Sequence, residues 1–274
     1  MTNKAAELKE NNSTLLFTFS GTGNSLYIAL KIQEHMENCE ILSISKAYNE
    51  KKFEYKAARI GFIFPVYFLD APHIVRQFLR NIKVIDPKTF LFAIANCGGE
   101  VGYTFHTISK ILGKQNQKLN SEFGLVMPSN SIVMMDKTGS PEEVNRKLEN
   151  AEQKINEIIE IIKNSGSQTF ATTKVSFKNR FVSLMGKLFL FRIFNDRRYK
   201  VDEEKCTHCG TCVAVCPMNN IKLNNNKVTW SHNCECCAAC LHWCPENAIQ
   251  NMKTEGVPRY HHPKITFKQL KTYK

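Results

Sequence analysis

The sequence predicts an α/β protein with two domains: a doubly wound, five-stranded parallel sheet, followed by a small α+β domain rich in cysteine. Three observations support this fold class. Strand-like apolar segments alternate with helical patterns over the first 165 of the 274 residues. Nine of the eleven cysteines lie between Cys206 and Cys244. The chain is also longer than a typical single domain, which favours two.

Five strands are expected in the first half of the chain. The first begins at Thr14 and is followed by a loop with glycines and hydroxyls, then by a helical pattern that runs to Ile32. The third strand precedes a helix that starts near Pro72. The second to fifth strands are expected within EILSIS (40–45), ARIGFIFPVYF (58–68), TFLFAIANCGGEVGY (89–103) and FGLVMP (123–128).

A long helix is predicted between residues 141 and 165. Ser140 is the expected N-cap, Pro141 takes the first helical position, and Glu143 completes a capping box. Gly166 is expected to end the helix. The apolar stripe that would face the sheet consists of Val144, Leu148, Ala151, Ile155, Ile158 or Ile159, and Ile162.

The loop after the first strand has the chemistry of a phosphate site. Its backbone amides and the hydroxyls of Ser20, Thr22 and Ser25 are donors, and the N-terminus of the next helix favours negative charge. The loop lacks the lysine of a Walker motif and the third glycine of a dinucleotide-binding motif. A purely structural turn between strand and helix is the alternative interpretation.

Unusual residues follow the first, third and fourth strands, at the edge where parallel sheets bind ligands. Over residues 15–162 this pattern resembles flavodoxin, which implies a flavodoxin-like fold that binds flavin mononucleotide (FMN). In that family the first loop holds the phosphate, and the other two loops bracket the isoalloxazine ring. The resemblance implies phosphate contacts from Ser20, Gly21, Thr22, Gly23, Asn24 and Ser25; ring contacts from Pro65, Val66, Tyr67 and Phe68; and backbone amides for the pyrimidine edge from Asn96, Cys97, Gly98 and Gly99.

The cysteine-rich region contains two copies of one pattern, C-x2-C-x2-C-x3-C-P. A shift of 28 residues places Cys206, Cys209, Cys212 and Cys216 on Cys234, Cys237, Cys240 and Cys244. Cys236 is the surplus cysteine, with no cysteine at the matching position of the other copy. In a reducing compartment, so many cysteines indicate metal ligation or redox chemistry rather than disulfides.

Residues 200–253 resemble the two-cluster 4Fe–4S ferredoxins, in which the fourth cysteine of each copy ligates the other copy's cluster. The resemblance implies cluster one on Cys206, Cys209, Cys212 and Cys244, and cluster two on Cys234, Cys237, Cys240 and Cys216. A structural zinc module is the alternative, because C-x2-C pairs also form tetrahedral zinc sites. His208 and His242 are expected to be partly exposed residues over the clusters rather than ligands.

The predicted organisation has four parts: a flavodoxin-like FMN-binding domain (1–165), a basic linker (166–200), a two-cluster 4Fe–4S ferredoxin domain (201–253) and a C-terminal tail (254–274). The linker has eight Lys and Arg residues and one acid, within a chain of net charge +12. We interpret it as a helix that packs the domains together; peripheral membrane contact through residues 178–200 is the alternative. The tail is expected to be an extended strap over one domain, with His261 and His262 at the surface.

The whole chain resembles the flavodoxin–ferredoxin fusion proteins of anaerobic bacteria and archaea. This implies an electron-transfer flavoprotein that moves electrons between two 4Fe–4S clusters and FMN, and on to a redox protein partner or a small acceptor such as a quinone. Electron carrier and FMN- and iron–sulfur-dependent oxidoreductase both stay open, because catalysis would belong to the cofactors. The other hypothesis is an interaction protein with a zinc module and a basic linker that binds membrane or nucleic acid.

The composition also bears on location and partners. No apolar run approaches the roughly 20 residues of a membrane span. The first residues, MTNKAAELKE, lack the apolar stretch of a signal peptide, so a cytoplasmic location is expected. Two clusters and a flavin phosphate would remove about six positive charges, which disfavours nucleic-acid binding.

Overall fold

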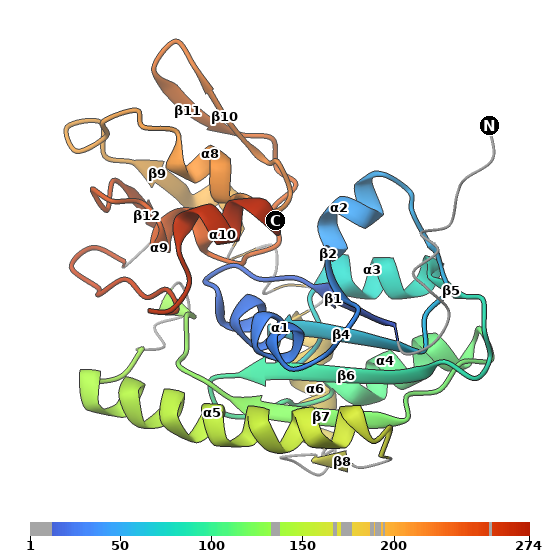
Figure 1. Ribbon diagram of the computed structural model, residues 1–274. Helices are drawn as coiled ribbons and strands as arrows, with labels where there is room; N and C mark the ends of the chain where they lie inside the picture. The colour runs from blue at the N-terminus through green and yellow to red at the C-terminus, as the bar shows by residue number, and fades with distance from the viewer. Residues whose placement is uncertain are drawn as a thin grey trace.

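The structure, a computed structural model, contains the predicted parallel sheet. It describes residues 13–132, 138–166, 169–170, 177–186, 189, 193, 195–251 and 254–274. The strands are β1 (Thr14–Thr18), β2 (Cys39–Ser43), β4 (Arg59–Pro65), β6 (Phe90–Cys97), β7 (Ser121–Val126) and β8 (Thr169–Phe170). All pairs are parallel, in the order β2-β1-β4-β6-β7-β8 (Figure 1). The five predicted strands follow the flavodoxin-like order, and the two-residue β8 extends their edge. β3 (Glu54–Tyr55) and β5 (Lys83–Val84) form a separate pair.

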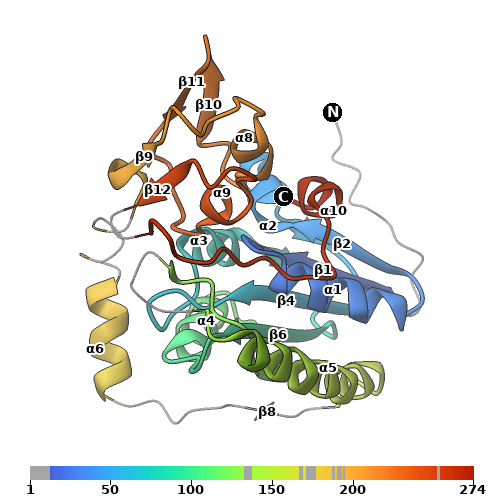
Figure 2. The same ribbon diagram turned by 90° about the vertical axis from the view of Figure 1, so that its left-hand side faces the viewer.

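The sheet separates two apolar cores because successive side chains of a strand point to opposite faces. On β1, Leu15 and Phe17 belong to one core and Leu16 to the other. The Leu16 face is covered by α1 (Asn24–Glu34) and α5 (Pro141–Lys163), and the other face by α2 (Ile44–Asn49), α3 (His73–Asn81) and α4 (Thr104–Gly113) (Figure 2). Covered faces explain why these strands are continuous apolar runs.

Helix α5 is the predicted long helix. Ser140 caps it by accepting a hydrogen bond from the backbone amide of Glu143, and Pro141 is its first residue. The predicted capping box is wrong in one detail: the Glu143 carboxylate ion-pairs with Lys147 at 2.9 Å, and Glu142 is the acid that hydrogen-bonds Ser140. The buried face consists of Ala151, Ile155, Ile158, Ile159 and Ile162.

The cysteine-rich region has two antiparallel pairs and two short helices. β9 (Tyr199–Val201) pairs with β12 (Ile249–Asn251), and β10 (Ile221–Asn224) pairs with β11 (Lys227–Trp230). The helices are α8 (Thr211–Val215) and α9 (Ala239–His242). Figure 1 shows this region beside the carboxyl ends of the sheet strands.

The sequence repeat is also a repeat of backbone conformation. His208 and Cys236, which are 28 positions apart, both have left-handed φ angles, of 56° and 55°. Gly210 and Ala238 form a second such pair, with φ angles of 73° and 54°. Cys236 therefore occupies in the second copy the position that His208 occupies in the first.

The linker region contains helix α6 (Phe177–Met185), which packs against the first domain beside α4 (Figure 2). The hydroxyl of Ser183 donates to the buried carboxylate of Asp70 at 2.5 Å. Gly186 lies against Phe68, where a Cβ would come within 2.5 Å of the Phe68 Cβ. Phe181 and Leu184 are exposed over 55% and 51% of their surface. The remainder of the linker that the structure describes includes a 3-10 helix, Asp196–Arg198.

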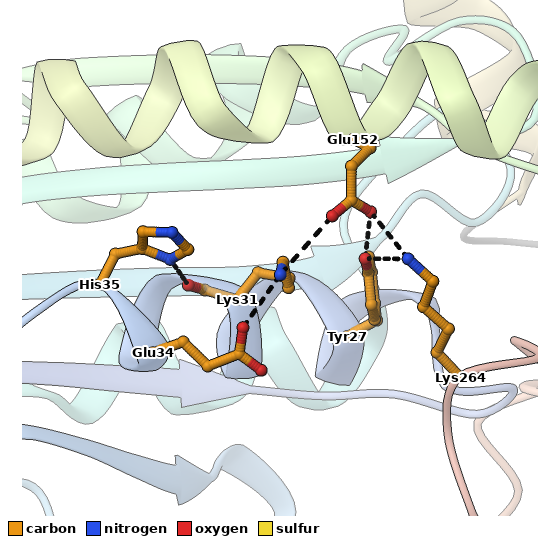
Figure 3. Close-up of polar contacts among 6 residues, drawn as sticks. All are labelled: Tyr27, Lys31, Glu34, His35, Glu152 and Lys264. Atoms are coloured by element: carbon orange, nitrogen blue, oxygen red, sulfur yellow. Dashed lines mark hydrogen bonds and ion pairs between the residues drawn. The ribbon is translucent and has the colours of Figure 1, made fainter.

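The C-terminal tail contacts both domains and ends in a helix, α10 (Phe267–Thr272), so the expectation of an extended strap over one domain is wrong. The amide of His262 donates to the carbonyl of Thr22 at 2.8 Å. Lys264 reaches the hydroxyl of Tyr27 at 3.2 Å and Glu152 at 3.5 Å (Figure 3). At the other end, Nζ of Lys274 donates to the carbonyl of Val213 in α8 at 3.2 Å.

The two tail histidines differ in burial. His261 is exposed, as predicted, and stacks on Trp243 with ring centroids 4.2 Å apart. His262 is 1% exposed, because its ring stacks on Tyr27 at 4.0 Å, so its predicted surface position is wrong. Within the part of the chain that the structure describes, no helix combines the length and apolar character needed to cross a bilayer.

Candidate functional site

The loops after β1, β4 and β6 enclose a cleft at the carboxyl edge of the sheet, with a cavity volume of about 280 Å³. This volume is near the lower end of the range for ligand pockets. The cleft lies where β1 and β4 are neighbours, the position at which flavodoxin-like sheets bind ligands. Thirteen of the fourteen predicted residues line it: Ser20, Gly21, Thr22, Asn24, Ser25, Pro65, Val66, Tyr67, Phe68, Asn96, Cys97, Gly98 and Gly99.

Gly23 is the predicted residue that does not line the cleft. Its φ angle is +96°, a conformation that favours glycine. A Cβ at Gly23 would come within 3.1 Å of Ile265 and 3.2 Å of His262. Gly23 therefore faces the C-terminal tail, and the turn it allows directs the neighbouring residues into the cleft.

Side chains of the first loop hold the cleft together. Ser25 donates to Oδ1 of Asn96 at 2.6 Å, which ties the loop to β6. Asn24 donates to the carbonyl of Pro128 at 3.1 Å and accepts from the hydroxyl of Tyr260 at 2.7 Å. The side chain of Asn24 is thus engaged with protein rather than directed at a ligand. The Ser20 hydroxyl, which accepts from the Gly23 amide, keeps its own proton for an anion.

The loop after β4 carries strained residues. Phe68 and Leu69 have φ angles of 52° and 56°, which are uncommon for large side chains. Tyr67 and Asp70 close the loop with two backbone hydrogen bonds, at 2.8 and 3.0 Å. The Asp70 carboxylate also accepts from Thr107 of α4 at 3.0 Å and from Ser183 of α6. One buried acid therefore fixes the aromatic loop to two helices.

Sequence reasoning missed several residues of the cleft. Pro128, Ser129, Asn130 and Ser131 line it from the loop after β7, and Val182 and Cys236 line it from α6 and the cysteine-rich region. The run P-S-N-S at the end of the fifth strand is a signal that could have identified the first four, because it lies at the same edge of the sheet. Val182 and Cys236 carry no local signal, because their position depends on how distant segments pack.

The eight predicted cluster ligands line two cavities in the cysteine-rich region. Cys206, Cys209, Cys212 and Cys244 line one, and Cys216, Cys234, Cys237 and Cys240 line the other. Each cavity combines three cysteines of one copy with the fourth of the other copy, the grouping that the ferredoxin resemblance implies. Among the described residues, no three His, Cys, Asp or Glu side chains are grouped for a single metal ion.

Hydrogen bonds to sulfur repeat in the two copies. The amide of Asn220 donates to Sγ of Cys216 at 3.4 Å, and the amide of Ala248, 28 positions later, donates to Sγ of Cys244 at 3.3 Å. Such bonds stabilise charge on thiolate ligands and tune cluster potentials. Cys209 Sγ and the hydroxyl of Thr211 are hydrogen-bonded at 3.3 Å, and this interaction lowers the pKa of the exposed Cys209 thiol.

Three buried donors near the second cavity have no acceptor among the described residues. They are the hydroxyls of Tyr67 and Tyr199 and Nε1 of Trp230. Tyr199 and Trp230 line this cavity, and Cys237, which also lines it, has the largest electrostatic effect of any residue on Tyr67. Burial, and then the neighbouring cysteines, raise the pKa of both tyrosines well above 10. An unpaired buried donor costs about 1–3 kcal/mol, and the sulfides of a cluster would supply the acceptors. The residues therefore fit such a group.

The second cysteine cavity adjoins the cleft. Nε1 of Trp243 donates to the carbonyl of Gly21 at 3.1 Å. A Cβ at Gly21 would lie 2.6 Å from the carbonyl oxygen of Cys237, so the two loops are in direct contact. His242 joins the same junction, donating from Nε2 to the carbonyl of Asn130 at 2.8 Å and accepting at Nδ1 from the amide of Tyr260.

The histidines of the cysteine loops also differ. The side chain of His208 is 31% exposed, as predicted. His242 is 3% exposed, and burial lowers its pKa to about 4, so the prediction of partial exposure is wrong for this residue. Its burial follows from its contact with the first domain, which the cysteine spacing does not reveal.

Glu235, between two predicted ligands, reaches the first domain. Its carboxylate accepts hydrogen bonds from the backbone amides of His73 and Ile74, at the N-terminus of α3, and lies near Arg76. Negative charge is favourable at a helix N-terminus. Burial is the larger influence and raises the pKa of Glu235 to about 7. The loop of the second cavity is thus attached to α3 as well as to the first loop of the cleft.

Comparison with protein families gives one match, between residues 199–222 and Fer4, the 4Fe-4S binding domain. The matched residues contain the first copy of the cysteine pattern. This match supports a 4Fe–4S cluster in the second domain, and an iron–sulfur electron-transfer role, over a zinc module. Comparison with curated protein sequences finds no match.

Comparison with solved structures finds similar chains, of which three are described here. The rubredoxin oxygen:oxidoreductase of the anaerobe Desulfovibrio gigas is 10% identical, with a TM-score of 0.34 over 57% of this chain and 37% of its own length. The FMN-dependent NADH-azoreductase of Bacillus anthracis is 11% identical, with a TM-score of 0.36. The match covers 55% of this chain and 99% of the azoreductase. A Streptococcus pneumoniae flavodoxin is 12% identical, with a TM-score of 0.30. The match covers 51% of this chain and 94% of the flavodoxin. This chain thus spans about a third of the length of the first of these proteins.

The strand order and the Fer4 match identify the two parts of the chain as a flavodoxin-like α/β domain and an iron–sulfur domain. The resemblance to flavodoxin–ferredoxin fusions is confirmed at this level.

Proposed function

We propose that the chain is an electron-transfer flavoprotein that binds FMN in the cleft and two 4Fe–4S clusters in the two cysteine cavities. The observation that carries this proposal is the contact between Gly21 and Cys237. Gly21 belongs to the loop suited to the flavin phosphate, and Cys237 belongs to the ligand set of cluster two. A redox centre on one loop would therefore lie next to a redox centre on the other.

The first loop would bind the phosphate of FMN through the hydroxyl of Ser20, the backbone amides of Gly21 and Thr22 and the N-terminus of α1. Tyr67 and Phe68 would cover one side of the ring, and the backbone of Gly98 and Gly99 would contact its pyrimidine edge. When bound, FMN supplies one- or two-electron chemistry, and each cluster supplies single electrons. The protein groups bind these cofactors, orient them and exclude water.

Two neighbouring pairs of residues and one exposed cysteine support an order for the proposed centres. Cys212 of the first set is among the charged neighbours of Cys240 of the second set. Cys237 of the second set contacts the cleft loop. Cys209 of the first set is exposed. Together they support a path that enters or leaves at cluster one, where a redox protein partner can approach, and passes through cluster two to the cleft.

Cofactor analysis of protein purified without oxygen tests the proposal. We expect about eight irons, eight sulfides and one FMN per chain. Cys212→Ala removes a ligand of cluster one only, so it should halve the iron and leave FMN bound. Unchanged iron in this variant would contradict the ligand sets, and a colourless zinc-containing protein would contradict the whole proposal.

A reoxidation assay distinguishes an electron carrier from an oxidoreductase. Dithionite-reduced protein is mixed without oxygen with a nicotinamide, a quinone or an oxidised ferredoxin, and the flavin absorbance is followed. Reoxidation by a ferredoxin alone would identify a carrier between proteins. Turnover with a quinone or a nicotinamide would identify an oxidoreductase with that small acceptor.

A further inference from the structure

A second large cavity opens between α3, α4 and α6, on the side of the sheet away from α1 and α5. Its volume is about 500 Å³, within the range of small-molecule pockets. None of the described residues that line it is acidic. Six are basic: Arg76, Arg80, His106, Lys110, Lys114 and Arg180.

Three of these basic residues have no ion-pair partner among the residues that the structure describes. Lys110, Lys114 and Arg180 are exposed, and no described residue forms an ion pair with them. Lysines on other helices of the same chain do form ion pairs, such as Lys154 with Glu157 and Lys163 with Glu160. Like charges gathered around a concave surface produce a strongly positive potential, which attracts anions.

The wall that α6 contributes is fixed by buried contacts. Ser183, which lines the cavity, donates to Asp70 at 2.5 Å. Arg76 of α3 lies 4.0 Å from the same carboxylate, and Thr107 of α4 donates to it at 3.0 Å. All three helices of the cavity are thus joined through one buried acid. The backbone that carries the basic side chains is therefore held in place by buried contacts.

The cavity also has apolar and aromatic walls. Tyr103, Ile111 and Leu184 line it together with the basic residues. Arg80 and Lys110 can bind phosphate oxygens through charge-assisted hydrogen bonds, while Leu184 and Tyr103 can pack against an uncharged part of the ligand. A single phosphate would leave most of these cations unpaired.

We propose that this cavity binds a small molecule that carries two or more phosphate groups attached to an apolar or aromatic moiety. The site is separate from the cleft between the first loop and Tyr67, and the proposal does not depend on FMN being the ligand of that cleft.

Titration calorimetry with the full-length holoprotein tests the proposal, with inorganic pyrophosphate and ADP as probes at about 0.15 M salt. We expect saturable binding of both at one site, with ADP the tighter because its base adds apolar contacts. The double variant Lys110→Gln/Lys114→Gln should weaken both at least about tenfold, the effect of one lost charge-assisted hydrogen bond.

The matched control is Lys222→Gln/Lys227→Gln, which removes the same charge from exposed residues of the β10–β11 hairpin. This variant should bind both probes as the unaltered chain does. No saturable binding of either probe, or equal weakening in both double variants, would overturn the proposal. Vesicles of phosphatidylcholine with and without phosphatidic acid separate the sources of phosphate: binding to phosphatidic acid without binding to pyrophosphate or ADP would also overturn it.

Discussion

The indole Nε1 of Trp243 donates a hydrogen bond to the carbonyl of Gly21, 3.1 Å away and 222 positions earlier in the chain. Trp243 precedes Cys244, a proposed ligand of cluster one, and Gly21 belongs to the loop suited to a flavin phosphate. The bond therefore attaches the cysteine-rich region to the functional edge of the sheet. Because Trp243 is 9% exposed, water competes weakly for this bond.

Gly21→Ala should disturb this junction, whereas Gly99→Ala should not. A Cβ at Gly21 would lie 2.6 Å from the carbonyl of Cys237, whereas a Cβ at Gly99 would have no neighbour within 4 Å. Overpacking of this kind costs about 1–3 kcal/mol, which lowers the unfolding midpoint by roughly 2–6 °C. Thermal unfolding of the two variants measures the difference. Equal midpoints would show that the two loops are not in close contact.

Local sequence signals predicted the sheet and most of the cleft because both depend on short segments. The apolar runs of β1, β4 and β6 and the glycine loop after β1 can be read within about ten residues of sequence. The ferredoxin resemblance, which rests on the cysteine spacing, implied the two sets that line the cavities. The contact of Trp243 with Gly21 could not be predicted, since it depends on which surfaces of two domains meet.

The C-terminal tail was predicted wrongly in two respects: one had a local sequence signal that was missed, and the other had no local signal. Helix α10 had a local signal that was missed, the capping box of Thr266 and Gln269. The burial of His262 had none, because it results from stacking on Tyr27 in α1. Histidine is intermediate in its tendency to be buried, so the tertiary contact rather than the residue type decides its position.

Trp230→Phe should lower the reduction potential of cluster two. The Nε1 of Trp230 is buried beside the second cavity without an acceptor, so it can donate to a cluster sulfide and stabilise the reduced, more negative state. Loss of one such bond is worth about 1 kcal/mol, or roughly 40 mV for one electron. A redox titration followed by electron paramagnetic resonance measures the shift. Trp243→Phe is the control, because its indole is already bonded to Gly21; an equal shift in both variants would contradict the assignment.

His262 should make the junction sensitive to acid. Burial, then Lys264, lower the pKa of His262 to about 4, against the opposing effect of Glu152. Because the folded-state pKa lies below the unfolded value of about 6.5, the unfolded chain binds the extra proton first. The contribution of His262 is complete above pH 6.5 and is lost as the pH falls from about 6.5 to about 4.

His262→Phe keeps an aromatic ring on Tyr27 but removes this titration. The decrease in unfolding midpoint between pH 7 and pH 5 should therefore be smaller in the variant than in the unaltered chain, as measured by circular dichroism. His261→Phe, at the neighbouring exposed position, should leave the pH dependence as it is. An identical decrease in all three proteins would mean that the buried ring does not control acid stability.

Cys236→Ala should retain both clusters, whereas Cys234→Ala should lose one. The two cysteines are two positions apart, but only Cys234 lines the second cysteine cavity, while Cys236 lines the cleft. The amide of Cys236 donates to Sγ of Cys234 at 3.3 Å, and this bond survives the loss of the Cys236 side chain. Iron analysis should give about eight atoms per chain for Cys236→Ala and about four for Cys234→Ala.

The Cys236 thiol should instead affect the ligand of the cleft. Alanine at this position keeps the left-handed backbone, as Ala238 does two residues later, so the loop should retain its shape. Removing the sulfur enlarges the cleft next to the proposed flavin. Because the surroundings of the flavin change, its absorption bands should shift while the iron content stays constant. Loss of iron from Cys236→Ala would instead make Cys236 a ligand, and the 28-residue correspondence between the two copies would then not describe the clusters.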